Sequence, residues 1–200
     1  NSYGGGFFNY VPPVEVAAFL KPTSYQPGNV LTHIIYHLCR TENNLTKSDL
    51  CRALVCTMDF GGSCANDCFD CGLLGALQGV LLVGSHDLTV DAGDVLCAAL
   101  LSDGVQLTEH LSNQCMTLLL ELFDTTDLNL LSSVISAIKV LFTQAMMKQH
   151  AIAQAHVVSD KVDELLVHPN MQIADLASSL EDLVSCFHGE EVGTDDDEEY

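Results

Sequence analysis

The sequence predicts an all-α protein, and three features carry this prediction. From Asn29 onward the chain contains a single proline, Pro169, and its apolar residues recur at spacings of three and four. Residues that cap helices stand where these periodic stretches begin, and short polar turns separate them. The 200 residues are 48% hydrophobic, which is enough apolar material for a sizeable core. We therefore expect an antiparallel stack or bundle of about seven or eight helices.

Three segments of different composition divide the chain. Residues 1–28 hold a glycine triplet, four of the five prolines and three of the five tyrosines, so we expect an extended N-terminal arm. Residues 29–188 form the predicted helical domain. Residues 189–200 contain seven acids and no base, which predicts a solvated acidic tail.

The first two predicted helices are marked by their caps. Asn29 can cap a helix that runs to about Arg40. Thr46, with Asp49 three residues later, has the capping arrangement for a helix over 47–59.

A glycine stripe marks the next predicted helix, over 66–83. Gly72, Gly75 and Gly79 are spaced by three and four residues, so they share one face. Because such a face lets another backbone approach, we expect this helix to pack tightly against a neighbour; the alternative is that the face lets a ligand approach.

The second half of the chain has the clearest helical periodicity. Between Asp127 and Met147 the apolar residues follow the spacing of three and four without a miss, which predicts one long buried face. A final helix with the same pattern follows Pro169. Shorter helices are expected near 90–102, 105–123 and 159–167.

The run LLVHPNMQIADLASSLEDLVSCF, residues 165–187, resembles the junction between helices in armadillo and HEAT repeats. In those families a His-Pro or similar turn is followed by an alanine-rich helix. The first half of the chain shows no fixed period of the ~40 to 47 residues typical of such repeats. The resemblance implies a stacked helical scaffold that binds partners on a surface and brings no catalytic residues with it.

The charge of the chain excludes some partners. The chain has seven basic and 27 acidic residues and thus a formal net charge of −20. Such a charge repels the phosphates of nucleic acids and anionic lipid head groups. Charged residues make up 17% of the chain against a usual ~25%, so we expect part of its surface to be covered by something else. The longest apolar run, 71–84, is shorter than a bilayer span, and we expect no membrane span.

Nine cysteines, an odd number, are densest between Cys51 and Cys71. The candidates for disulfides are Cys51, Cys56, Cys64, Cys68 and Cys71, with the pairing left open. Asn44 begins the sequon Asn44-Leu45-Thr46 and is a candidate for glycosylation. Both features favour an extracellular or secreted protein; the alternative is a cytoplasmic protein with reduced cysteines.

Two short motifs could hold a metal, but their surroundings argue against it. The spacing of Cys64, Cys68 and Cys71 can hold an iron–sulfur cluster, yet the strands of an enzyme built around one are missing. His33 and His37 lie one helical turn apart, without the glutamate that zinc peptidases place after the first histidine. We therefore expect no catalytic residues, no metal and no cofactor.

These observations favour a non-enzymatic structural or protein-interaction module. We expect it to self-assemble or to dock on a partner protein, because its charge density is low and its arm is rich in glycine and aromatic residues. A carrier for a hydrophobic ligand such as a lipid is one alternative. An intracellular armadillo-like adaptor is another.

Overall fold

The computed structural model describes residues 30–59, 62–82 and 84–189, and these form helices and no strands, which confirms the all-α prediction. The predicted arm over 1–28, its neighbour Asn29 and residues 190–200 of the predicted tail lie outside the described residues. The helices are α2 Val30–Arg40, α3 Asn44–Met58, α4 Gly62–Asp70, α5 Leu73–Leu81, α6 His86–Leu101, α7 Glu109–Leu122, α8 Leu128–Lys148, α9 Ala155–Leu166 and α10 Met171–Gly189.

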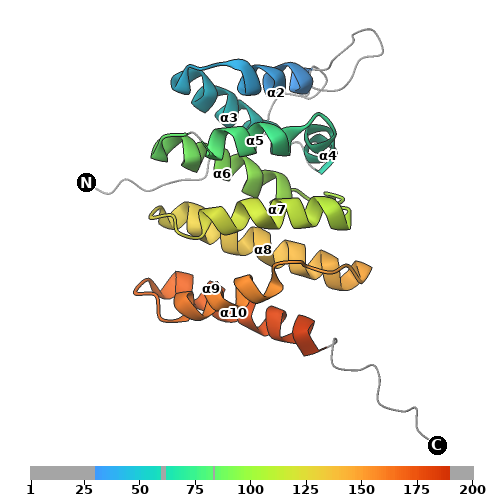
Figure 1. Ribbon diagram of the computed structural model, residues 1–200, viewed down its shortest axis with the longest axis vertical. Coiled ribbons are helices and arrows are strands. Elements are labelled where there is room, and N and C mark those ends of the chain that lie inside the picture. Colours follow the sequence, from blue (N-terminus) through green and yellow to red (C-terminus); the bar gives the residue numbers. More distant parts are fainter. Residues whose placement is uncertain (1–29, 60–61, 83, 190–200) are drawn as a thin grey trace, which may run out of the picture.

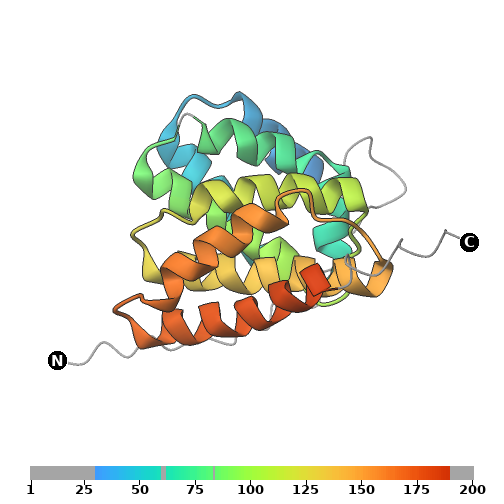
Figure 2. The same ribbon diagram turned by 60° about the horizontal axis from the view of Figure 1, so that its bottom comes forward.

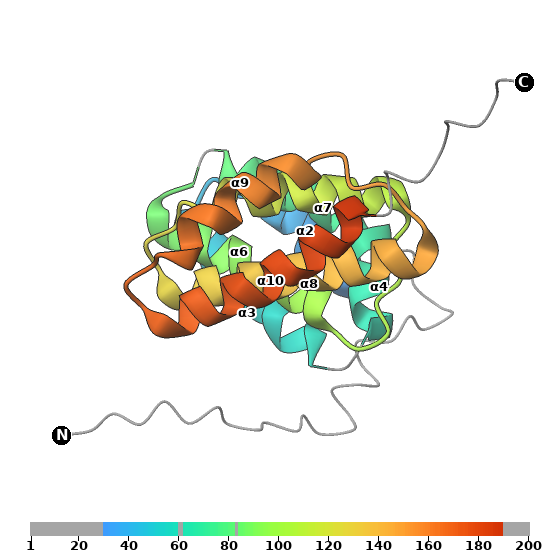
Figure 3. The same cartoon turned by 90° about the horizontal axis from the view of Figure 1, so that it is seen from below.

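The helices form antiparallel pairs that stack along the long axis of the molecule (Figures 1 and 2). The pairs are α2–α3, α5–α6, α7–α8 and α9–α10. One layer contains α3, α6, α8 and α10, which pack on one another in series; the other contains α2, α5, α7 and α9 (Figure 3). The turns within the pairs all lie at one edge of the stack, on the left in Figure 1, and the connections between pairs lie at the other.

Helix α8 is the centre of the core and confirms the predicted face over 127–147, except at its first residue, Leu128, which is exposed. Its buried residues include Val134, Ile138 and Phe142, and the Phe142 ring meets Phe187 of α10 edge to face with centroids 5.2 Å apart. By length and composition alone α8 could cross a membrane, but half of its most apolar stretch is buried inside the stack. Packing against α6, α7 and α10 accounts for its apolar character.

The predicted single helix over 66–83 is wrong, because Gly72 breaks it. Gly72 has φ +89°, a left-handed conformation that an α-helix does not contain, and it separates α4 from α5. The expected tight packing of the glycine face is also wrong: a Cβ on Gly75 or Gly79 would meet nothing within 4 Å. Close approaches occur instead at Gly84, where a Cβ would lie 2.6 Å from the Val80 carbonyl oxygen, and at Gly93 of α6, where it would lie 2.9 Å from Cδ1 of Leu130.

Several helix ends also differ from prediction. Asn43 rather than Thr46 caps α3, since its side chain accepts a hydrogen bond from the Thr46 backbone N–H at 3.1 Å. Helix α6 begins at His86, before the expected 90, because Ser85 provides an extended residue ahead of it. Gly189, placed in the tail by composition, is the last residue of α10.

Two asparagines fix the connections between successive pairs. The Asn66 side chain accepts from the backbone N–H of Gln106 at 2.9 Å and donates to the carbonyl of Gly104 at 3.4 Å. The Asn113 side chain accepts from the N–H of Ala153 at 2.9 Å and donates to the carbonyl of Ala151 at 3.3 Å. Each asparagine thus holds a connection that lies about forty residues further along the chain.

These two asparagine clamps occupy equivalent positions 47 residues apart. Each is preceded by a small buried residue, Ala65 or Ser112, and followed two positions later by a fully buried cysteine. Each connection that they hold buries one aliphatic residue, Val105 or Ile152. The stack therefore contains a recurrence of these features; between Asn66 and Asn113 the chain passes through the rest of α4, the pair α5–α6 and the start of α7.

Replacing Asn113 by alanine should lower the free energy of unfolding by about 1 to 2 kcal/mol, because both hydrogen bonds to the 151–153 connection are lost. Urea denaturation measures the change. Asn129→Ala, at an exposed position of α8, serves as the control and should change stability by a few tenths of a kcal/mol. Equal stability of the two variants would show that the clamp contributes nothing.

Candidate functional site

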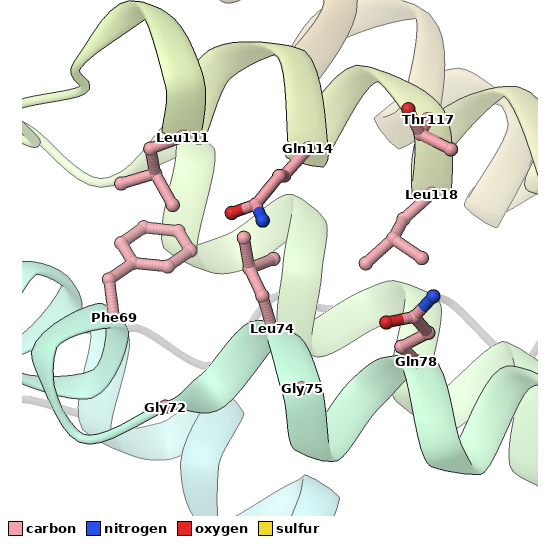
Figure 4. A pocket seen from close by; sticks show the side chains of 9 residues that line it. All are labelled: Phe69, Gly72, Leu74, Gly75, Gln78, Leu111, Gln114, Thr117 and Leu118. Carbon is pink, nitrogen blue, oxygen red and sulfur yellow. The ribbon is translucent and has the colours of Figure 1, made fainter.

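A groove runs between α5 and α7 on one face of the stack (Figure 4). Its volume is about 360 Å³. We call it the α5–α7 groove, and its lining consists of Phe69, Gly72, Leu74, Gly75, Gln78, Leu111, Gln114, Thr117 and Leu118. No charged residue is among them, although the chain has a net charge of −20.

The two walls of the groove combine apolar and amide groups. Leu74 and Gln78 come from α5, and face Leu111, Gln114 and Leu118 of α7 across the groove (Figure 4). Aliphatic side chains bury apolar groups of a ligand, while a glutamine amide both donates and accepts hydrogen bonds. The lining contains no titratable side chain, and its one hydroxyl, that of Thr117, hydrogen-bonds to the Asn113 carbonyl and to Gln154.

The groove exists because glycines replace side chains on α5. Gly72 and Gly75 leave the space above the α5 backbone empty, as the open surroundings of their missing Cβ atoms show. The opposite wall is held in place. Thr117 donates to the Asn113 carbonyl at 3.0 Å and accepts from Gln154 Nε2 at 3.1 Å, which ties α7 to the start of α9.

A second, larger pocket of about 500 Å³ lies between α3 and the start of α6 and has a different character. Its lining includes the carboxylates of Asp87, Asp91 and Asp127. Asp91 is already engaged, because it accepts a hydrogen bond from Ser48 and lies 3.8 Å from Arg52. Asp127 is also engaged, since its side chain accepts from two backbone N–H groups as the cap of α8.

Asp94 lies beside this acidic pocket in an unfavourable setting. Burial raises the pKa of its carboxyl, and the negative charges of Asp127 and Asp91 raise it further. The folded protein thus holds this proton more strongly than the unfolded chain does, and ionised Asp94 weakens the fold.

Asp94→Asn should therefore raise the free energy of unfolding at pH 7. The gain should shrink as the pH falls through the pKa of folded Asp94, because the wild-type carboxyl then becomes neutral as well. Urea denaturation at pH 7 and at acidic pH measures both effects. The exposed Asp175 of α10 provides the control, Asp175→Asn, and a gain of Asp94→Asn that persists unchanged in acid would contradict the argument.

All nine cysteines lie in the described residues, and no disulfide joins any of them in the structure. Of the disulfide candidates, Cys51 and Cys68 are buried core residues, Cys64 and Cys71 are half-buried on α4 and at its end, and Cys56 is exposed. Their pairing therefore stays a prediction.

Burial makes four thiols unreactive. It raises the pKa of Cys51, Cys68 and Cys115 to about 12, and it also raises the pKa of Cys97. For Cys68 the neighbouring Cys71 and Cys64 add to the effect. Since only the thiolate reacts, a rise from 9.0 to about 12 reduces the reactive population at neutral pH roughly a thousandfold.

In the folded, reduced protein, the exposed Cys39, Cys56 and Cys186 should react fast with a thiol reagent, and the four buried thiols only after unfolding. Counting labelled sites by mass, before and after urea, measures this. In a second experiment the protein is unfolded without prior reduction. If all nine thiols still react, the predicted disulfides are contradicted. Fast labelling of Cys97 in the native state would contradict the core packing.

The structure also locates the predicted glycosylation site and the two histidines. Asn44 is exposed at the first turn of α3 and lines the acidic pocket, so the glycosylation candidate stands at the surface. His33 and His37 are exposed on α2. Within the described ranges, no three His, Cys, Asp or Glu side chains come together in a way that could hold a metal ion.

No protein-family profile matches this chain, and no curated protein is significantly similar to it. The armadillo and HEAT resemblance of residues 165–187 is thus not supported by a family match. Sequence reasoning missed the α5–α7 groove, although the exposed Gly72, Gly75 and Gln78, spaced by three residues, were a signal that one face of this helix carries little bulk.

Proposed function

We propose that this protein is a non-enzymatic interaction scaffold that binds an extended, uncharged protein segment in the α5–α7 groove. The observation that carries the proposal is the lining of that groove: aliphatic walls, a glycine floor, two glutamine amides and no charge. An extended segment offers side chains to the walls and its backbone N–H and C=O groups to the amides.

The ends of the stack favour lateral binding over end-to-end assembly. The exposed residues of the terminal helices include His33, His37 and Arg40 on α2 and Asp175 and Asp182 on α10, beside the exposed Tyr36 and Met171. Terminal units of stacked helical proteins need such polar outer faces to stay in solution as single stacks. This arrangement supports a scaffold of the armadillo or HEAT kind, as the resemblance of residues 165–187 implies.

A peptide array tests the proposal. The intact protein should prefer uncharged peptides with aliphatic and aromatic residues over lysine-rich or aspartate-rich peptides. Gly75→Leu, which fills the groove from its floor, should weaken binding roughly tenfold, a loss of about 1.4 kcal/mol.

The matched control is Gly79→Leu. Gly79 lies one turn further along α5, has equally open surroundings and does not line the groove, so both variants gain the same helix propensity. Binding by Gly79→Leu should match the wild type. Equal binding by Gly75→Leu, or a preference for basic peptides, would contradict the proposal, and the second result would direct attention to the acidic pocket.

A further inference from the structure

We propose that the occupant of the α5–α7 groove is the N-terminal segment 3–14 of the same chain. The inference rests on the proposed function, because it identifies the ligand of the same groove. Residues 3–14 read YGGGFFNYVPPV. They lie outside the described residues.

The chemistry of the segment matches that of the groove. Residues 3–14 contain no charged side chain, and Glu15 follows directly after them. The four aromatic residues Tyr3, Phe7, Phe8 and Tyr10 supply large apolar surfaces for the leucine walls. Glycines and prolines disfavour helix formation, so their backbone groups stay available to Gln78 and Gln114.

The described chain begins beside the groove. Helix α2 starts at Val30, and Thr32 Oγ1 lies 3.1 Å from Sγ of Cys71. Cys71 directly precedes Gly72, a residue of the groove lining. The described chain therefore begins near the end of the groove formed by Phe69 and Gly72.

The intervening chain is long enough to reach. Residues 15–29 span up to ~50 Å when extended, at ~3.3 Å per residue. Helix α5, with nine residues, is only about 14 Å long. A short tether of this kind gives an effective concentration in the millimolar range, so even a weak contact in the groove is populated.

Photocrosslinking in the 200-residue chain tests the inference. A benzoylphenylalanine at position 110, exposed on α7 one turn before Gln114 and outside the groove lining, should form crosslinks to residues 3–14 that mass spectrometry locates. The same group at position 143, exposed on α8 in the other layer, should form none with that segment. Gly75→Leu should reduce the crosslink yield at least severalfold, and Gly79→Leu should leave it unchanged.

An equal mixture of isotopically light and heavy protein separates the two possible sources of the segment. Crosslinks that join only light to light and heavy to heavy support the inference. Light-to-heavy crosslinks to residues 3–14 show that the segment of a second copy fills the groove, which overturns the inference and leaves the proposed function standing.

A full-length variant with Phe7→Asp and Phe8→Asp provides the second measurement. It should lose the crosslinks and bind the uncharged array peptides about threefold or more tightly, because the groove is then no longer filled from within the chain. Array binding by the wild type without crosslinks to 3–14 overturns the inference alone. Failure of both crosslinking and array binding overturns the proposed function as well.

Discussion

Each helix pair of this protein has an apolar face that it cannot bury alone, and stacking on the next pair is what buries it. The layer of α3, α6, α8 and α10 shows this most clearly, since α8 lies between α6 and α10 and has nine buried residues. The order of the stack follows from this need. Short turns within each pair make its helices antiparallel, and the connections between pairs then return along the opposite edge.

Stacking creates a second problem, which the asparagine clamps solve. The connections 104–106 and 151–153 bring backbone N–H and C=O groups close to the core, because each buries an aliphatic residue, Val105 or Ile152. Buried backbone groups need hydrogen-bond partners. Asn66 and Asn113 provide both a donor and an acceptor, and Lys148 adds a hydrogen bond of 2.8 Å to the Leu107 carbonyl.

Features that follow from local periodicity could be predicted from the sequence. Features that depend on contacts between residues far apart in the chain were missed. Helix α8 was predictable because every turn places an apolar residue on the buried face. The break at Gly72 was not, since a glycine is compatible both with a weak helix and with the left-handed conformation that ends one. The clamps left a faint signal, a small residue followed by Asn, any residue and Cys, at 65–68 and 112–115. The groove left less, because its width is the distance at which packing holds α5 and α7, and the periodicity of neither helix gives that distance.

An uncharged groove on so acidic a protein limits how a ligand can find it. The negative field of the molecule draws basic groups toward carboxylates such as Asp87 and Asp91, and gives no attraction to a neutral peptide. Without such steering, association of a free neutral segment is slow, with typical rate constants of about 10⁵ to 10⁶ M⁻¹s⁻¹. A segment joined to α2 needs no steering, since the chain itself keeps it near Gly72. A neutral partner protein that competes with this segment gains no long-range attraction from the charges either, so it must bind through contacts inside the groove. The leucine walls and the two amides are then the determinants of specificity.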